Sequence, residues 1–274
     1  YENYGFLILD NASTDNTRSI IQDFKDSRIK LVELSEDIGQ TSALNKGLDM
    51  IYTKFVARMD ADDFSFNNRL ELQMAFMQEN PEIVLLGTNY FITNEQGKII
   101  VERVLPLDHQ NIIDTFVFYN PFAHSSVLFN RKKILEVGGY PEEFNYSQDK
   151  ALWMKISQHY KVANLPSRLI KIRHHSNQAS SRPELLSTIK RDAVNLTEMA
   201  LNNLNLSTKA KKKCLHMIVR TNLGFGLALL KENKYLLAYE VIIKIFVMYP
   251  SLTIYYLKRK LMQTKGNILF AVLV

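Results

Sequence analysis

The sequence predicts an α/β fold with a mostly parallel central sheet, followed by a region built from helices. The first half of the 274 residues alternates short β-branched, apolar runs with segments whose apolar residues recur at helical spacing. This alternation is typical of strands joined by crossover helices. From residue 182 onward the spacing is almost purely helical. We therefore expect two domains, 1–181 and 182–274, with the boundary in the polar, proline-containing stretch at 180–183.

The expected elements follow one another regularly through the first domain. Strands are expected at 6–9, 29–34, 55–59 and 83–86, and helices at 13–25, 41–51 and 69–78. Residues 88–104 are expected to form two strands joined by a turn at 94–97. Ligands of open α/β sheets bind beyond the carboxyl ends of strands. Asp10 and the cluster that begins at Asp60 occupy such ends, so both are candidates for a binding site.

The composition is that of an ordinary globular protein, with 46% hydrophobic residues, 10 Gly and 7 Pro. The single cysteine, Cys214, has no partner for an internal disulfide and no metal-ligand spacing, so we expect a reduced thiol that serves in packing. The first residues lack the basic and apolar segments of a secretory signal, and no apolar run reaches the length of a membrane span. We expect a cytoplasmic protein without a transmembrane helix.

Charge is distributed unevenly along the chain. Residues 181–274 hold 15 Lys and Arg against 5 Asp and Glu, whereas the first 180 residues hold 19 against 23. A basic region of this kind either contacts an anionic membrane or forms solvated helix faces. A nucleic-acid partner is not expected, because the sequence contains neither a groove-reading motif nor a zinc-knuckle spacing.

Three groups of residues could carry chemistry. Asp60-Ala61-Asp62-Asp63, which contains a DxD motif, places three mutually repelling carboxylates directly after an expected strand. Mg²⁺ or Mn²⁺ would offset this repulsion, taking one or two protein carboxylates and completing its shell with water and substrate phosphates. The alternative is that these residues cap the following helix.

The second group lies within residues 9–17, where Asp10 could accept from a nucleobase or a ribose, while Ser13 and Asp15 are better explained as helix caps. In the third group, Asp149 precedes an apolar helix. Its carboxylate could act as a general base towards a nearby hydroxyl, or it could simply be an N-cap.

These groups belong to a larger set of short motifs that occur in order along the chain. The motifs lie at 9–17, 43–47, 57–63, 68–70, 123–127, 137–140, 148–153 and 173–175. Together they cover residues 1 to about 180, and over this span the chain resembles the inverting glycosyltransferases of family 2. The resemblance implies the GT-A fold of nucleotide-diphospho-sugar transferases and a divalent metal cofactor, Mn²⁺ or Mg²⁺.

The resemblance also implies roles for individual residues. Asp149 would be the base that deprotonates the acceptor hydroxyl as it attacks the anomeric carbon with inversion. Asp62 would ligate the metal, with His175 as a second ligand. The substrate-binding residues would be Asp10 at the base, Asp60 near the ribose, and also Asn11, Asn45, Arg69, His124, Gln148 and Trp153. For His124 a hydrogen bond within the fold or a place at the acceptor site is favoured over metal binding.

The chain departs from the family pattern at three points. It starts about one strand and one helix later than the family usually does, Gln148 replaces the common Glu before the base, and the Gln-x-x-Arg-Trp segment of processive synthases does not follow Trp153.

We therefore expect a non-processive hexosyl- or N-acetylhexosaminyl-transferase. It would move one sugar from a nucleotide-diphosphate donor, in particular a UDP-sugar, to a glycan or lipid-linked acceptor in cell-surface polysaccharide synthesis. The basic helices would hold it at the inner face of the plasma membrane. The alternative is a catalytically impaired sugar-nucleotide-binding or scaffold protein. A nucleotidyltransferase would need a Gly-rich phosphate loop near the start, and none is visible.

Overall fold

The computed structural model describes residues 1–144, 146–175 and 185–263. Side chains of the last helix are described as far as Arg259. The chain divides into two compact units, Tyr1–Gln178 and Ala179–Val274. The boundary expected at 180–183 lies outside the described residues.

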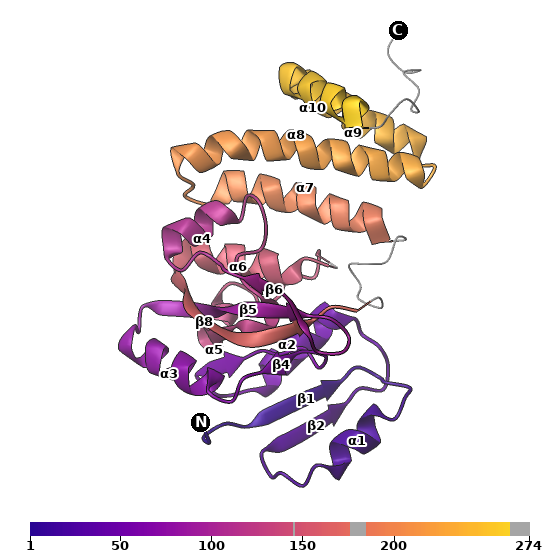
Figure 1. Ribbon diagram of the computed structural model, residues 1–274. Coiled ribbons are helices and arrows are strands. Elements are labelled where there is room, and N and C mark those ends of the chain that lie inside the picture. The colour runs from indigo at the N-terminus through magenta and orange to yellow at the C-terminus, as the bar shows by residue number, and fades with distance from the viewer. Residues whose placement is uncertain (145, 176–184, 264–274) are drawn as a thin grey trace. The chain divides into compact units, whose positions relative to one another are not determined.

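The first unit begins with a two-stranded parallel sheet that is separate from the main sheet (Figure 1). Phe6 pairs with Ile29 at one end of this sheet, and Asp10 pairs with Glu33 at the other. The elements are β1 (Phe6–Asp10), α1 (Thr17–Asp23), β2 (Ile29–Glu33) and α2 (Gln40–Met50). All four form where the apolar spacing predicts them.

The main sheet has six strands in the order β3-β7-β5-β8-β4, with β6 paired to β5. The strands are β3 (Phe55–Ala57), β4 (Phe64–Ser65), β5 (Ile83–Thr93), β6 (Ile99–Arg103), β7 (Leu128–Asn130) and β8 (Lys161–Arg173). The strand expected at 83–86 and the first strand expected within 88–104 form a single element, β5. The turn expected at 94–97 is present: Gly97, with φ +79°, donates its backbone N–H to Asn94 O at 2.9 Å.

The α/β fold class is confirmed, but the pairing is more mixed than the alternation predicts. The pairs β1·β2 and β5·β8 are parallel, whereas β3·β7, β5·β7, β5·β6 and β4·β8 are antiparallel. The reason for the β5·β6 pair is local, because a tight turn returns the chain beside the strand it has just left. The others join strands that are far apart in the sequence, so their directions cannot be read from neighbouring residues.

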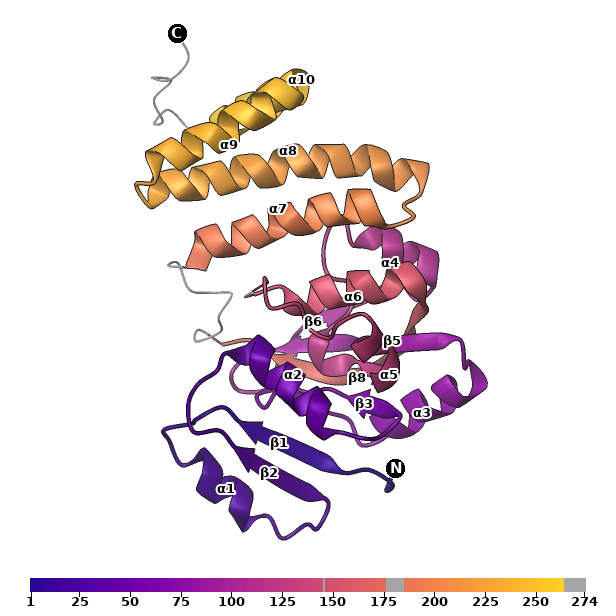
Figure 2. The ribbon, with the colours of Figure 1, turned by 180° about the vertical axis from the view of Figure 1, so that it is seen from behind.

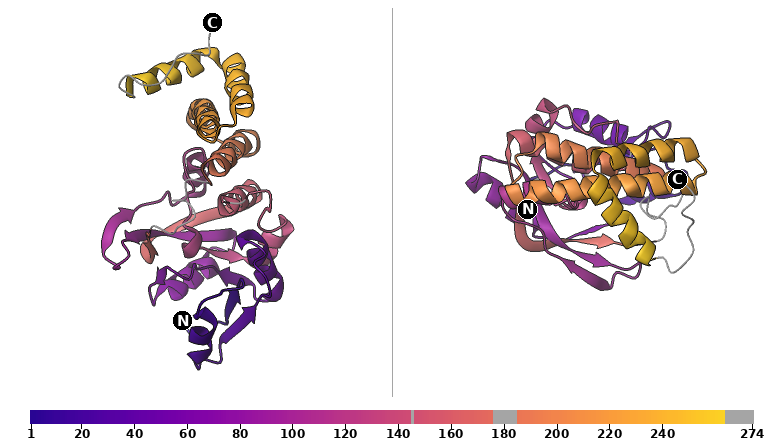
Figure 3. Two further views of the ribbon diagram at one scale, coloured as in Figure 1. Left: turned by 90° about the vertical axis from the view of Figure 1, so that its right-hand side faces the viewer. Right: turned by 90° about the horizontal axis from the view of Figure 1, so that it is seen from above.

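Helices cover both faces of the main sheet. The helices of this unit after α2 are α3 (Arg69–Glu79), α4 (His109–Thr115), the 3₁₀ turn η1 (His124–Ser126), α5 (Arg131–Glu136) and α6 (Gln148–His159). Figures 1 and 3 show α3 on one face of the sheet and α6 on the other. The core is centred on Trp153 of α6, which is fully buried among Phe122, His124, Phe129 and Tyr140. Packing of this kind fixes the start of α6, where Asp149 lies.

The second unit consists of helices. They are α7 (Leu186–Asn203), α8 (Thr208–Lys231), α9 (Tyr235–Met248) and α10 (Pro250–Gln263). Figure 2 shows α7 and α8 lying side by side, and α8 also packs on α9 and α10. Cys214 is buried between α8 and α7, with its Sγ 3.6 Å from Thr197 O. Across the described residues, no helix combines the length and apolarity that a bilayer crossing requires.

Candidate active site

The loop after β3 carries the three carboxylates and is anchored by Arg58 and Ser125. The Arg58 guanidinium donates to both oxygens of Asp60. The Ser125 hydroxyl lies 2.9 Å from Asp60 Oδ2 and accepts from the Asp60 backbone N–H at 3.0 Å. The same hydroxyl also contacts the Asp63 carboxylate, so the carboxylates of Asp60 and Asp63 share a single hydrogen-bond donor. The negative charge of Asp60 is therefore already paired with the Arg58 guanidinium.

Asp63 joins this loop to the end of β8. Its Oδ1 accepts from the Arg173 backbone N–H at 3.0 Å, and burial raises the pKa of its carboxyl. The connection brings His175, two residues further on, to Asp62, with His175 Nε2 3.0 Å from Asp62 Oδ2. The Asp62 side chain is 44% exposed, so its carboxylate remains open to an incoming ligand. The structure thus brings together the two residues predicted to hold a metal.

A small cavity of about 130 Å³ lies beside Asp62. Its lining also includes the two cationic residues Lys171 and Arg173 from β8. The Lys171 ammonium lies 5.1 Å from the centre of the Phe64 ring, a cation–π contact that holds it over the loop. In such a hollow the carboxylate can bind a metal ion and the two cations can bind phosphate oxygens. The lining therefore suits a metal-bound phosphate group.

Asp149 lies in the first turn of α6, where its two oxygens are held by different donors. Asn120 Nδ2 donates to Oδ2 at 2.7 Å, and the Lys150 backbone N–H donates to Oδ1 at 2.7 Å. Burial raises the pKa of the Asp149 carboxyl, the charge of Asp60 adds to this rise, and the Lys150 N–H and Arg58 oppose it. The ionisation of Asp149 therefore responds to the charges of Arg58 and Asp60, which both belong to the loop after β3.

Asn120 is a site residue that sequence reasoning missed. It precedes Pro121, and an Asn-Pro dipeptide normally signals only a turn. Its contact with Asp149 spans 29 residues of sequence, so no local pattern indicates it.

Arg69 was predicted to bind substrate, and the structure gives it a supporting position instead. Its side chain is buried, with Nε donating to Gln73 Oε1 at 2.9 Å. Its Nη2 donates to the carbonyl oxygens of Arg58 at 2.9 Å and Val127 at 3.1 Å. Burial lowers the pKa of Arg69 to about 10. These bonds fix the backbone behind Asp60, because two main-chain oxygens there depend on one guanidinium.

Asn45 was also predicted to bind substrate, and its amide is engaged with the backbone of Tyr140. Asn45 Nδ2 donates to Tyr140 O at 2.9 Å, and the Tyr140 N–H donates to Asn45 Oδ1 at 2.8 Å. A Cβ atom at the neighbouring Gly139, where φ is +70°, would lie 2.8 Å from the same Oδ1. The amide thus holds Tyr140 against the aromatic core.

Asn45→Ala is therefore expected to reduce the free energy of unfolding by about 2 kcal/mol, because it leaves two backbone groups of Tyr140 without partners. Denaturant unfolding of the full chain measures this loss. Asn67→Ala, which removes an exposed amide, should change stability by less than about 0.5 kcal/mol. An Asn45 variant as stable as the Asn67 variant would contradict the supporting role.

Three more of the predicted substrate-binding residues lie in or near the core. Trp153 is fully buried and Gln148 is 4% exposed, so neither presents its side chain to a ligand. Gln148 Nε2 donates to Gln40 Oε1 at 3.1 Å. His124 Nε2 lies 2.9 Å from the Tyr140 hydroxyl, and burial keeps the pKa of His124 well below its usual value. Gln148 and Trp153 belong to α6, the helix that carries Asp149, and His124 packs against Trp153.

Asp10 and Asn11 make their described contacts within the first 38 residues. Asp10 Oδ1 accepts from the Ser13 N–H at 3.2 Å, and Arg18 Nε donates to Oδ2 at 2.5 Å. The bonds from Ser13 and Arg18 lower the pKa of Asp10 against the effect of burial. Asn11 bridges to the next loop, with its Oδ1 accepting from the Ile38 N–H at 3.1 Å. These contacts shape the end of the two-stranded sheet.

The donors available for a metal are Asp62 and His175. Within the described ranges, no set of three or more His, Cys, Asp or Glu side chains is arranged to hold an ion. Two protein donors still fit Mg²⁺ or Mn²⁺ when substrate phosphates and water complete the shell. The exposed Asp62 carboxylate beside the hollow leaves room for those oxygens.

Comparison with known proteins identifies the family of the chain. The pattern of Glycosyl transferase family 2 matches residues 1–139, which is half of the chain. The chain belongs to this family.

Two curated relatives are glycosyltransferases of amylovoran and O-antigen biosynthesis. The chain is 37% identical over 153 residues to the amylovoran biosynthesis glycosyltransferase AmsE of Erwinia amylovora, a match that covers 56% of this chain and 57% of AmsE. It is 36% identical over 155 residues to the O-antigen biosynthesis glycosyltransferase WbnJ of Escherichia coli, covering 55% and 59%. The chain thus spans less than two thirds of either relative.

Solved structures confirm the GT-A fold. S. aureus TarS residues 1–349 superpose with a TM-score of 0.59 at 15% identity, covering 93% of this chain and 82% of that one. The mannosyltransferase PcManGT of Pyrobaculum calidifontis, in complex with GDP-Man and Mn²⁺, superposes with a TM-score of 0.55 at 18% identity, covering 95% and 72%.

Proposed function

We propose that this chain is an inverting, non-processive transferase that moves one sugar from a nucleotide-diphosphate donor to a hydroxyl of a glycan or lipid-linked acceptor. A uridine donor is the first choice. The observation that carries the proposal is Asp149, a carboxylate of raised pKa that is held by Asn120 and lies within electrostatic reach of Asp60. A single such base suffices for inversion, because no glycosyl-enzyme intermediate has to form.

In the proposed reaction the acceptor hydroxyl gives its proton to Asp149 as its oxygen attacks the anomeric carbon. The bond from that carbon to the nucleoside diphosphate breaks on the opposite face. Lys171 and Arg173, which line the hollow beside Asp62, would face the diphosphate and offset its negative charge. Asp62 and His175 would hold a divalent ion, which when bound supplies further charge compensation to the leaving group.

Donor binding tests the proposal on this chain. Calorimetry with a panel of nucleotide diphosphates and nucleotide sugars, in Mn²⁺ and then with a chelator, should show binding of one nucleotide that depends on the metal. Turnover of the bound donor sugar with an acceptor supports the transferase. Binding without turnover of any acceptor would favour a sugar-nucleotide-binding protein instead.

Replacing Asn120 with Ala should shift the pH dependence of activity. The Asn120 amide donates to the Asp149 carboxylate and so stabilises its ionised form. Its loss raises the pKa of Asp149 further, and the acidic limb of the kcat/KM profile should move to higher pH. The alkaline limb should stay in place.

A matched control for this variant is Asn80→Ala, which removes a side-chain bond to Phe76 O at the end of α3. The control should leave both limbs unchanged. An Asn120 variant whose activity falls equally at every pH would show that Asn120 acts on folding rather than on the base.

A further inference from the structure

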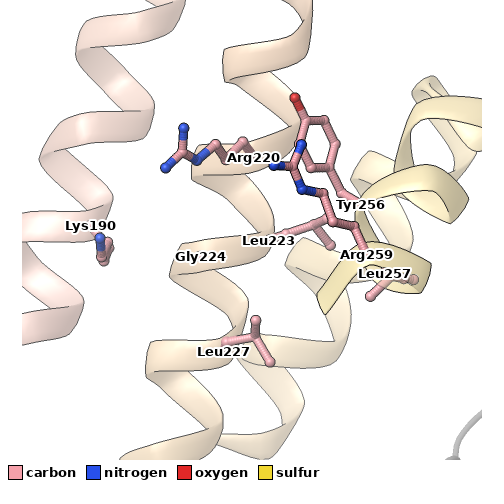
Figure 4. A pocket seen from close by; sticks show the side chains of 8 residues that line it. All are labelled: Lys190, Arg220, Leu223, Gly224, Leu227, Tyr256, Leu257 and Arg259. Carbon is pink, nitrogen blue, oxygen red and sulfur yellow. The ribbon is translucent and has the colours of Figure 1, made fainter. Parts of the chain in front are cut away.

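The second unit contains a cavity of about 420 Å³, whose lining includes none of the residues assigned to the proposed reaction. Helices α7, α8 and α10 each contribute to its wall (Figure 4). The lining residues are Lys190, Arg220, Leu223, Gly224, Leu227, Tyr256, Leu257 and Arg259. Because all of them belong to this unit, the cavity is a property of the helical region itself.

The polar part of the lining is cationic. Lys190 comes from α7, Arg220 from α8 and Arg259 from α10, so three helices each direct one positive charge to the same hollow. None of the described lining residues carries a carboxylate. Like charges around one hollow repel one another, and an anion bound between them would relieve that repulsion. Arg also offers paired donors that match the oxygens of a phosphate group.

The remaining wall is apolar and open. Leu223, Leu227 and Leu257 line it together with the Tyr256 ring. Gly224 has no side chain, so the surface of α8 is recessed at this point. A Cβ atom there would have only Lys190 Cδ within 4 Å, at 3.9 Å. An inorganic anion alone would leave this apolar wall without a partner, whereas a phosphate ester with a hydrocarbon chain would cover it.

We propose that this cavity binds the phosphate group of an anionic amphiphile, with the three cations on the phosphate and the leucines on the apolar chain. The proposal concerns binding by the helical unit and does not rest on the transferase activity. It also assigns the binding of an anion to three named cations of this region, rather than to all its basic residues together.

The test compares two triple variants of the full chain that lose the same charge. K190Q/R220Q/R259Q empties the cavity of cations, and K209Q/K211Q/K212Q removes three exposed lysines from the first turns of α8. The probe is a short-chain phosphatidylglycerol below its micelle concentration, followed by calorimetry, with inorganic phosphate as a second probe. Affinity for the lipid should fall about 100-fold in the cavity variant and only a few-fold in the control. Far-ultraviolet circular dichroism verifies that both variants keep their helices.

Gly224→Leu distinguishes the contribution of the hydrocarbon chain to binding from that of the phosphate group. The added side chain would fill the apolar side of the cavity, so lipid binding should fall at least about 10-fold, as expected when a buried hydrocarbon contact is lost. Gly224→Ala, which the available space accommodates, should bind normally. Equal losses in the two triple variants, or no binding of either probe, would overturn the site. Tight binding of inorganic phosphate that Gly224→Leu leaves unchanged would overturn the amphiphile and make free phosphate the ligand.

Discussion

Asp149→Asn should lower kcat by about 10²- to 10⁴-fold at neutral pH, which is the contribution of a general base, while leaving donor affinity unchanged. The amide occupies the same volume and can still accept from the Lys150 N–H, but it cannot take the proton of the acceptor hydroxyl. Steady-state kinetics and donor calorimetry on the same protein measure the two effects separately.

A nearby carboxylate provides the matched control for Asp149→Asn. Glu143 is exposed in the segment before α6, and Glu143→Gln should keep full activity. Near-normal turnover in the Asp149 variant, with folding intact, would remove Asp149 from the reaction and leave the choice of base open.

The raised pKa of Asp149 also predicts how stability responds to this change. Its pKa is higher in the folded protein because burial disfavours the ionised carboxylate, so ionisation costs stability as pH rises through that pKa. At neutral pH the Asn variant avoids this cost of ionisation, but it loses the bond from Asn120 Nδ2, because its own NH₂ group stands in the place of Oδ2. A base that reduces stability in this way is consistent with a residue kept for function.

The positions of the candidate-site loops could be predicted from the sequence because they depend on local patterns. The strand expected at 55–59 runs directly into Asp60, Asp62 and Asp63, and so places carboxylates just after a strand whatever the rest of the chain does. The observed strand, β3, ends slightly earlier, at Ala57. The same holds for Asp149, which lies in the first turn of α6, just before its apolar residues. Residue type and local spacing were sufficient for both.

The supporting contacts could not be predicted, because they join residues far apart in the sequence. Ser125 reaches Asp60 across 65 residues, and Asn45 reaches Tyr140 across 95. A polar residue in a motif looks the same whether its side chain faces a ligand or the backbone behind the ligand. Arg69 shows this most clearly, since its buried guanidinium donates to the main-chain oxygens of Arg58 and Val127.

Asp62→Ala should remove most of the effect of metal on donor binding. Asp62 supplies the exposed carboxylate of the Asp62–His175 pair, and losing even an indirect partner of a metal costs about 10- to 100-fold in affinity. A direct ligand should cost at least as much. The ratio of donor affinities measured in Mn²⁺ and in chelator is expected to fall towards one in this variant.

Two further variants make this result specific to the site. His175→Ala removes the weaker donor and should lower the same ratio by a smaller factor, because the carboxylate charge remains to hold the ion. Glu95→Ala removes an exposed carboxylate from the β5–β6 turn and should leave the ratio unchanged. If Asp62→Ala behaved like Glu95→Ala, the pairing of Asp62 with His175 would be structural, and donor binding would have to rely on the cations Lys171 and Arg173 of the adjoining hollow.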